Sequence, residues 1–450
     1  MGQPESFDLN HYEYKNLPSD LRSSLRRQSL LPILICTFAL SYILYVGYIF
    51  EITKLFREAK IERGALLASD MFSYKTHTTL NFKKDSLTVA VEGERGSTYK
   101  LDNYPEWFIG DKDKFEIVLR NGFKLRYEKS VLYYFVPNYG EIEISKNNDQ
   151  IFVDLPSKNL LPEGIRFSEL KFDARPLFEH RIQYSRSKIE IHYYEFGWEN
   201  FWFPMHSPFN NLSFVNLWEL ILSSERIKAD ESNFITIFNE FWNHPDWQHG
   251  DLAVAVLETI LMAFLGTLVA TLVGLPLAFA AAQNINPSKL TRFGIKRFFD
   301  FVRGLDYLIW SLIFIRSFGL GPLTGALAIA FTDTGTLGKL FTEALENVEK
   351  KEREGVQATG ATPVQQFRFG IIPQISPILV SQILYYFESN TRSATVIGAL
   401  GAGGIGLMLV QTMRTRRDWE NSLYIIIVAL ILVFLIDNLS SRLRKKLIRG

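Results

Sequence analysis

Apolar residues in this chain gather in long blocks toward both ends, and the stretch between the blocks is dense in charge. The first block, residues 30–50, has 21 residues without a charged side chain, and a helix needs about 20 apolar residues to cross a bilayer. Further apolar blocks cover residues 259–282, 307–315, 317–332, 371–413 and 422–436. The pattern predicts an α-helical polytopic membrane protein with about six spanning helices.

The first apolar block has a competing interpretation as a cleaved signal peptide. The apolar region of a signal peptide is usually about 7–15 residues long, and small residues mark the cleavage site that follows it. No such site follows Phe50 before Glu51. Length and flanks therefore favour an uncleaved helix preceded by a cytoplasmic segment, residues 1–29.

Residues 51–205 are predicted to form a helical stalk, to about Ser69, and then an inserted β-rich soluble domain at 70–195. Asn121-Gly122 joins two apolar runs and is a strong hairpin signal. Short runs rich in β-branched and aromatic residues occur at 86–91, 115–119, 131–136, 151–155 and 189–194. Such runs between Gly, Asn and Asp are typical of strands.

An aromatic cluster follows these runs, with members Tyr193, Tyr194, Phe196, Trp198, Phe201, Trp202 and Phe203. Such rings settle at bilayer interfaces, and a hydrophobic core patch is the alternative interpretation. A second set recurs at helical spacing: Phe234, Ile237, Phe238, Phe241 and Trp242. Residues 206–250 are therefore expected to be an amphipathic segment that lies on the membrane or packs against the spanning helices.

Basic residues flank the helix ends and set the expected orientation. They are Arg22, Arg26 and Arg27 before the first span, Lys289, Arg292, Lys296 and Arg297 after the second, and Arg442, Arg444, Lys445, Lys446 and Arg449 after the last. The positive-inside rule places these ends, with the basic tail 442–450, in the cytoplasm and the β-rich domain outside. The exceptions are Arg414, Arg416 and Arg417, which this order of spans places outside.

Composition narrows the function further. A formal net charge of +1 gives no general attraction for nucleic acid. The single cysteine, Cys36, excludes an internal disulfide and a Cys-rich metal site. No phosphate-binding G-x-x-x-x-G-K-[ST] sequence occurs, since Leu340 follows Gly338-Lys339. The histidines of the β-rich region, His77, His180 and His192, lack ligand spacing and are expected to be structural. We expect no catalytic residue, no metal site and no cofactor in this chain.

A spaced motif lies in the charged segment between two apolar blocks, which is predicted to be a loop at 340–373. Its markers are Glu354, Gly360 with Ala361 after it, and Pro373 thirteen residues beyond the glycine. A short helix, a glycine turn and a proline that begins the next helix form a rigid knob, which can carry movement from a partner. This spacing resembles the coupling loop of ABC importer permeases, with Gly355-Val356 in place of two alanines and Gly370 in place of an isoleucine.

A second stretch narrows the resemblance. Residues 387–398 continue into a glycine-rich run, whose glycines are Gly398, Gly401, Gly403, Gly404 and Gly406. The stretch resembles the corresponding helix of phosphonate-type ABC importer permeases. It also satisfies the dinucleotide pattern G-x-G-x-x-G, but that pattern should follow a strand and open a soluble helix. Inside an apolar segment, the glycines favour close helix approach or an irregular backbone that lines a pathway.

The resemblance covers residues 209–447 and leaves out the β-rich domain. It implies an ABC permease fold at 251–441 in a bacterial inner membrane. It also implies a homodimer of this chain and an ATP-binding subunit dimer that docks at the coupling loop and binds ATP and Mg. An external binding protein would deliver phosphonate or a related oxyanion.

Three charges interrupt the apolar blocks: Glu388, Arg392 and Arg316. Charges within a bilayer are costly, so they are functional candidates. Arg392, with Arg316, would draw an anion into the pathway, because a guanidinium fork matches tetrahedral oxyanions. Alternatively, Glu388 and Arg392 lie four residues apart on one helical face and neutralise each other, which is the favoured interpretation.

Other classes of function remain as alternatives. A secondary transporter needs intramembrane ion ligands and usually internal symmetry, whereas these blocks hold few acidic residues and no evident repeat. A membrane-anchored envelope sensor or scaffold would use the β-rich domain. The spacing of the coupling motif argues against both, and an enzyme is least expected.

Overall fold

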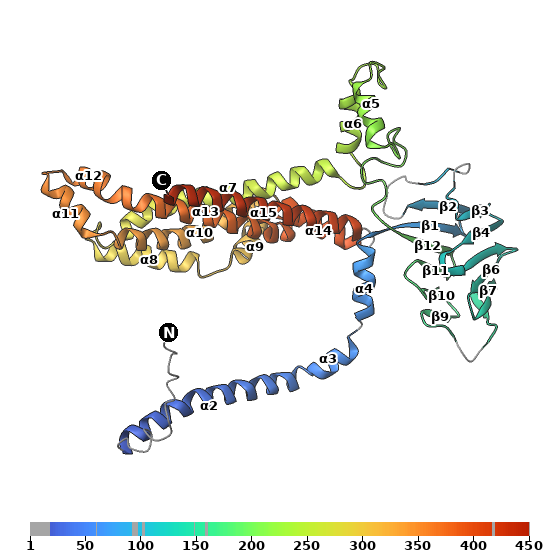
Figure 1. The fold of residues 1–450 in the computed structure, drawn as a ribbon, viewed down its shortest axis with the longest axis horizontal. Helices are drawn as coiled ribbons and strands as arrows, with labels where there is room; N and C mark the ends of the chain where they lie inside the picture. The colour runs from blue at the N-terminus through green and yellow to red at the C-terminus, as the bar shows by residue number, and fades with distance from the viewer. Residues whose placement is uncertain are drawn as a thin grey trace, which may run out of the picture. The chain divides into compact units, whose positions relative to one another are not determined.

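The architecture comes from a computed structural model that describes residues 19–59, 61–91, 98–100, 104–147, 149–157, 161–415 and 419–449 (Figure 1). The chain divides into two compact units, Met1–Leu66 and Leu67–Gly450. Within the described residues, four helices are long and apolar enough to cross a membrane: Leu31–Ile49, His249–Ala281, Val364–Ala402 and Trp419–Leu447.

The first unit contains helix α2 (Ser19–Ile49) and helix α3 (Ile52–Glu58), and α4 (Ile61–Asp70) begins in it. The apolar stretch of α2 has none of its residues buried within the structure. An apolar helix of this length with no buried residues is typical of a transmembrane helix surrounded by lipid, as the sequence predicts. Residues 1–18 of the expected cytoplasmic segment lie outside the described residues.

The β domain has two six-stranded sheets, formed by described residues. The first has the order β2-β1-β12-β11-β10-β9 and the second runs from β3 to β8 in sequence order. The strands of the first sheet are β1 (Ser73–Asn81), β2 (Ser86–Val91), β9 (Ile165–Ser168), β10 (Lys171–Ala174), β11 (His180–Ser185) and β12 (Lys188–Phe196). Those of the second are β3 (Phe108–Gly110), β4 (Lys114–Val118), β5 (Lys124–Glu128), β6 (Val131–Val136), β7 (Gly140–Asn147) and β8 (Gln150–Asp154).

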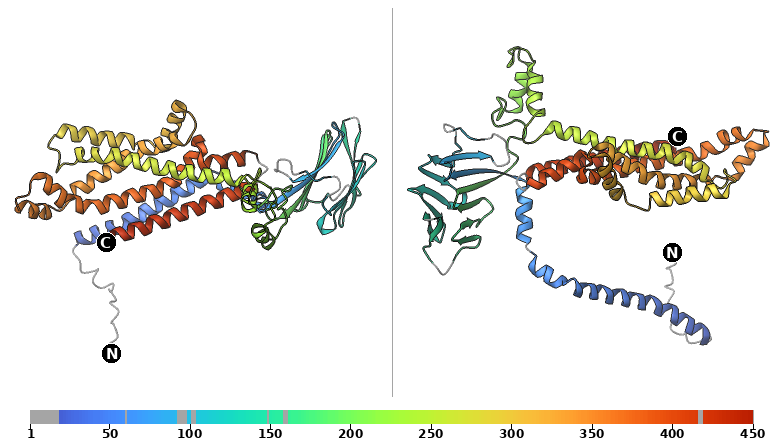
Figure 2. Two further views of the ribbon diagram at one scale, coloured as in Figure 1. Left: turned by 90° about the horizontal axis from the view of Figure 1, so that it is seen from above. Right: turned by 180° about the vertical axis from the view of Figure 1, so that it is seen from behind.

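The two sheets face each other (Figure 2), and one hydrophobic core contains residues of both. Alternate residues of the strands are buried, as in β4 and β5, because successive side chains of a strand point to opposite faces. The first and last strands are neighbours: β1 pairs with β12 over its whole length, from Ser73 opposite Phe196 to Asn81 opposite Lys188.

The predicted strands and hairpin are confirmed. All five predicted runs fall in strands, namely β2, β4, β6, β8 and β12. Asn121 and Gly122 form the turn between β4 and β5 with φ of 58° and 80°. Positive φ at both positions is what an Asn-Gly turn supplies at little cost.

The aromatic cluster after the β domain divides between two environments. Tyr193 and Tyr194 are buried in β12. Trp198 instead packs on Trp247, with ring centroids 5.3 Å apart. Phe201 contacts Tyr424 of the last helix at 5.2 Å. For these side chains, the structure supports the core-patch interpretation.

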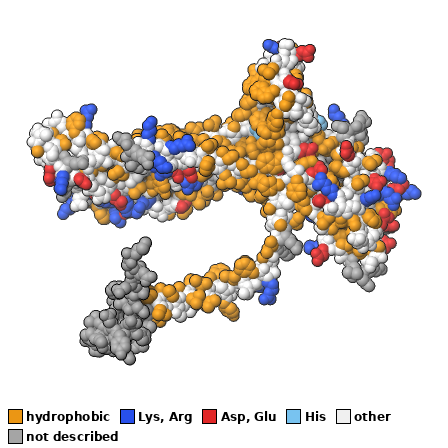
Figure 3. Space-filling view, in the orientation of Figure 1, with side chains coloured by type: hydrophobic (Ala, Val, Ile, Leu, Met, Phe, Trp, Pro, Cys, Tyr) orange, Lys and Arg blue, Asp and Glu red, His pale blue; other side chains and the backbone are white. Residues whose placement is uncertain are grey.

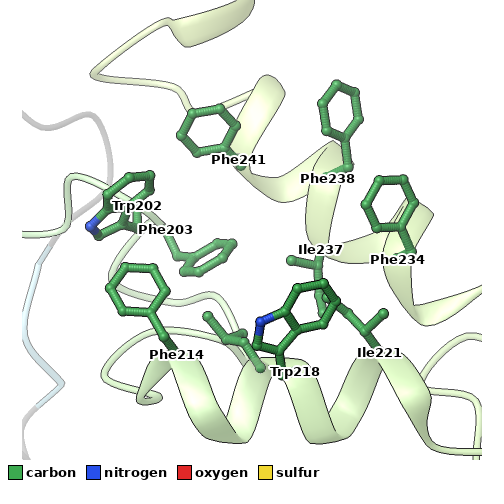
Figure 4. Close-up of a pocket in the computed structure, with 10 residues that line it drawn as sticks. Trp202, Phe203, Phe214, Trp218, Ile221, Phe234, Ile237, Phe238 and Phe241 are labelled. Atoms are coloured by element: carbon green, nitrogen blue, oxygen red, sulfur yellow. The ribbon is translucent and has the colours of Figure 1, made fainter.

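Residues 206–250 form two helices, where the sequence predicted a single amphipathic segment. They are α5 (Phe214–Leu222) and α6 (Asn233–Trp242), and the serine before each one caps it. Between them lies an apolar pocket (Figure 4), whose aromatic lining is Trp202, Phe203, Phe214, Trp218, Phe234, Phe238 and Phe241. Two apolar faces meet here because each helix is amphipathic.

The remaining helices form a bundle, in which the long helices run side by side in both views of Figure 2, while two short helices form a corner at one end. They are α7 (His249–Ala281), α8 (Lys289–Val302), α9 (Tyr307–Phe318), α10 (Pro322–Glu346), α11 (Lys350–Ala358), α12 (Pro363–Gln366), α13 (Ile372–Ile397), α14 (Gly404–Thr415) and α15 (Trp419–Arg449). Small residues bring α7 and α10 together: a Cβ on Gly274 would lie 3.3 Å from the backbone N of Gly338. Close approach through glycine is typical of membrane helices.

Two segments differ from the sequence-based expectation. The predicted loop 340–373 is still helical at its start, because α10 continues to Glu346. The predicted tail 442–450 is helical as far as Arg449, since α15 continues through it. Among the exceptional arginines, Arg414 lies in the last turn of α14, whereas Arg416 and Arg417 lie outside the described residues.

Candidate functional site

The predicted coupling segment forms a corner between α11 and α12 at the end of the bundle away from α14 (Figure 1). Gly360 makes the corner with φ of 80°, a left-handed conformation that favours glycine after a helix. Its N–H donates to the carbonyl of Gln357 at 3.0 Å. Glu354 and Gly360 are both exposed, so this corner is available to a partner.

A reciprocal cap fixes the second arm of the corner. The N–H of Thr362 donates to Oε1 of Gln365 at 2.8 Å, and the N–H of Gln365 donates to Oγ1 of Thr362 at 3.4 Å. This exchange satisfies two backbone donors that a helix start leaves free. The side chain of Gln366 also donates to the carbonyl of Ala361 at 3.0 Å. The corner is therefore tied together on both sides of Gly360.

Pro373 lies in the first turn of α13. A short π-helical stretch before it buries Gly370 and Ile371. Val364 and Phe369, by contrast, are 76% and 63% exposed. Two apolar side chains are thus accessible beside the corner.

The charges within α13 belong to a network with α15. Glu388 is 9% exposed and accepts hydrogen bonds from Arg392 at 2.9 Å and from Arg444 at 2.7 Å. Arg392 also pairs with Asp437 at 3.3 Å. The network holds two positive and two negative charges, so the interpretation as a structural pair fits this geometry better than an unpaired anion receptor.

Arg316 lies apart from that network. It is exposed in the last turn of α9, and none of the ion pairs among the described residues joins it to Glu388 or Asp437. The structure therefore does not bring Arg316 and Arg392 together.

The glycine-rich run breaks the helix between α13 and α14. The φ values are 116° at Gly401, 92° at Gly403 and 68° at Gly404. A Cβ on Gly398 would lie 2.3 Å from the carbonyl O of Gly403, and one on Gly406 would lie 1.8 Å from that of Thr395. Side chains at these positions would clash with backbone, so the run forms an irregular segment that only glycines allow.

The sequence analysis missed the group that holds this break in place. The carboxylate of Glu258 on α7 accepts from the N–H of Gly404 at 2.7 Å, and Oγ1 of Thr259 accepts from that of Ile405 at 3.0 Å. These side chains satisfy the free donors at the start of α14 and place negative charge near its positive end. A lone glutamate at the start of an uncharged block was the available signal.

A second missed group lies in the interior of the bundle. The side-chain N–H groups of Asn390 donate to Asp333 at 2.6 Å and to Thr267 at 2.8 Å. The three residues come from α13, α10 and α7, and each is buried. Polar side chains at such depth lock helices together when they are paired. An aspartate within an otherwise uncharged run was the signal.

The β domain shows no arrangement for chemistry among its described residues. His180 is fully buried, and its Nε2 lies 2.9 Å from the hydroxyl of Tyr134. Burial lowers the pKa of His180 to about 4, so its ring is neutral near pH 7. No group of three His, Cys, Asp or Glu side chains is placed to hold a metal in the described parts of the chain.

Comparison with known proteins gives matches for the membrane half of the chain. Residues 274–449 match the family described as binding-protein-dependent transport system inner membrane component. The chain is 37% identical over 187 residues to the putative phosphite transport system permease protein HtxC of Stutzerimonas stutzeri, which covers 42% of this chain and 66% of that protein. It therefore spans just under two thirds of that relative.

Two further matches cover nearly the whole of the other chain. The putative cryptic phosphonate transport system permease protein PhnE2 of Escherichia coli (strain K12) is 43% identical over 122 residues, which is 27% of this chain and 99% of that protein. The structure titled "Inward facing conformations of the MetNI methionine ABC transporter" aligns at 21% identity with a TM-score of 0.40, over 44% of this chain and 96% of that chain.

The family match includes the corner at Gly360, the charges of α13 and the glycine break, whereas α2 and the β domain lie outside it. The sequence-based resemblance is thus confirmed. The chain belongs to the family of binding-protein-dependent transport system inner membrane components, and it is a permease component rather than an enzyme.

Proposed function

We propose that this chain is the membrane-spanning permease subunit of an ATP-driven importer and forms the translocation pathway for phosphonate or a related small oxyanion. Relatives whose names refer to phosphite and phosphonate transport support this substrate class. A secondary transporter or an envelope sensor gains no comparable support.

The α11–Gly360–α12 corner carries the proposal. It is exposed, tied by hydrogen bonds on both sides and directly continuous with α13. A rigid knob of this kind transmits the movement of a separate ATPase into the spanning helices. ATP and Mg are bound by that partner, which docks at Glu354, Gly360, Ala361 and Pro373.

The orientation follows from charge. Lys and Arg side chains gather over α8 and the nearby end of the bundle, while its middle is largely apolar (Figure 3). We place this end and both termini in the cytoplasm and the β domain outside the inner membrane. Helices α9 and α10 complete six spans with the four apolar helices.

The other partners follow from the family. A second copy of the chain completes the pathway, membrane lipids surround the helices, and an external binding protein delivers the substrate. Within the pathway, the glycine break between α13 and α14 provides backbone that can rearrange between outward and inward states. Arg392 and Glu388 fix α13 to α15 in this scheme.

Co-purification of the ATPase subunit tests the proposal. Glu354→Ala combined with Gly360→Val should abolish co-purification and phosphonate uptake, because valine is strained at a φ of 80°. The matched control is Gly355→Ala, where an added Cβ meets open space. Retained ATPase binding and uptake in a well-folded double variant would contradict the proposal.

A further inference from the structure

Three cationic side chains surround one carboxylate where α8 packs on α10. Asp300 pairs with Arg297 at 3.0 Å, with Lys339 at 3.2 Å and with Arg303 at 3.5 Å. Asp306 follows on the same segment and caps α9 by accepting the N–H of Leu308 at 2.8 Å. Three cations against two carboxylates, Asp300 and Asp306, leave the described cluster with a net positive charge.

The cluster lies within the length of the spanning helices. Glu346, the last residue of α10, accepts the N–H of Gln283 at 2.8 Å, just after α7 ends at Ala281. These two helix ends are therefore level. Lys339 lies seven residues before Glu346, which is about 10 Å along the helix axis. Charges at such depth are costly unless they face water or other charges.

Close packing holds the cluster in place. A Cβ on Gly338 would lie 2.4 Å from the ring of Phe299, and one on Gly335 would lie 2.6 Å from its carbonyl oxygen. Asp333 precedes Gly335 by two residues and so points to another side of α10, where Asn390 donates to it. Asp333 therefore does not neutralise the cluster.

The cations remain available to a further partner. The side chains of Lys339, Arg303 and Arg297 are 39%, 40% and 64% exposed. Lys339 and Arg303 both approach Oδ1 of Asp300, so two like charges are held close and repel each other. An oxyanion would relieve this repulsion and use the guanidinium fork, which matches tetrahedral oxyanions.

We propose that Arg297, Arg303 and Lys339 form a binding site for a tetrahedral phosphorus oxyanion within the membrane domain. The choice of a phosphorus oxyanion as the ligand rests on the substrate class of the proposed function. A free oxyanion in transit and the phosphate of an anionic lipid headgroup share this chemistry, and the test below separates them.

The test measures binding of inorganic phosphite to the full chain in phosphatidylcholine nanodiscs by ³¹P NMR titration. Arg303→Gln and Lys339→Gln should each weaken binding about tenfold, because each removes a charge-assisted hydrogen bond. Asp300→Asn should strengthen binding about fivefold, since it removes a competing negative charge. A purely structural role for Asp300 predicts no such gain.

Lys296→Gln is the matched control on the same helix, because Lys296 pairs with Glu346 at 3.0 Å outside the cluster. It should bind phosphite as the unmodified chain does. If Arg303→Gln does not fold, Arg303→Lys keeps the charge without the fork and should bind about threefold more weakly.

Adding phosphatidylglycerol to the nanodiscs distinguishes a site for a free oxyanion from a site for a lipid headgroup. Competition by this lipid assigns the site to a headgroup, whereas unchanged phosphite affinity assigns it to the free oxyanion. The inference is overturned if the unmodified chain does not bind phosphite, or if Arg303→Gln and Lys339→Gln both bind it as tightly as the unmodified chain does. Failure of the proposed function looks different: the assembled transporter would move no oxyanion, while binding and its loss in the variants persist.

Discussion

Two charged networks within the bundle use the same residue types but differ in balance. In the α13–α15 network, Arg392 and Arg444 meet Glu388 and Asp437 in equal number. In the α8–α10 cluster, Asp300 faces three cations. The first network is closed around a buried carboxylate, and the second is half exposed. A balanced network can hold helices together by itself, whereas an unbalanced one is suited to bind an outside charge.

The largest effect is expected from Glu388→Gln. It leaves Arg444 without this carboxylate and Arg392 with Asp437, and loss of a hydrogen bond between charged groups costs about 1.5–3 kcal/mol. We expect a strong loss of folded protein in a thermal-shift assay with size-exclusion detection. Asp437→Asn is the control, because among the described residues Asp437 forms an ion pair only with Arg392 and is 40% exposed. Equal losses from both changes would contradict the closed network.

The sequence predicted only part of this network. The pairing of Glu388 with Arg392 follows from their spacing of four residues, and the structure shows that pair. Arg444 lies 56 residues from Glu388 and Asp437 lies 45 from Arg392. Helix packing determines which distant charges meet, so local spacing carried no signal for them. Arg444 was instead assigned to a basic tail, because its helix was expected to end earlier.

The α11–Gly360–α12 corner was more predictable because its geometry is local. Glu354, Gly360 and Pro373 are defined by fixed spacing along one segment, and the left-handed φ of Gly360 is a property of glycine itself. The cap of α14 by Glu258 joins residues 146 apart, so it had no such local signature. The β strands were recognisable from short runs rich in β-branched and aromatic residues, whereas the pairing of β1 with β12 required the whole sheet.

A lower pH is expected to destabilise the β domain through a buried histidine that belongs to neither charged network. The pKa of buried His180 is lowered to about 4 from an ordinary 6.5. The unfolded chain therefore takes up a proton first, and stability is lost as pH falls from 6.5 toward 4. At pH 5.5 the loss is about 1 kcal/mol. Thermal melts of the full chain at pH 7.5 and 5.5 would show it, and His180→Gln should reduce the difference in stability between the two melts by about 1 kcal/mol.

A smaller effect on stability is expected from Asp300→Asn, although the chemical change matches Glu388→Gln. Its partners are 39–64% exposed, and pairs of this kind contribute about 0–1 kcal/mol. The same thermal-shift assay should show little change. A loss as large as that of Glu388→Gln would mean that the α8–α10 cluster is structural.

The smallest effect is expected from Arg316→Gln. This side chain is exposed at the end of α9 and belongs to neither network. Exposed substitutions away from specific contacts usually change stability by less than about 0.5 kcal/mol. Thermal-shift and uptake assays should both match the unmodified chain. Reduced uptake with normal folding would restore Arg316 as a contributor to anion entry.

The pairing of β1 with β12 brings the first and last strands of the β domain together. Because Ser73 lies opposite Phe196, the polypeptide enters and leaves the β domain at positions about 5 Å apart. A domain whose two ends lie close together can be inserted or deleted as a unit. Its gain or loss during evolution leaves the spacing of the flanking helices unchanged. An ancestral permease could therefore acquire the β domain without a change to its membrane half, to which the family match is confined.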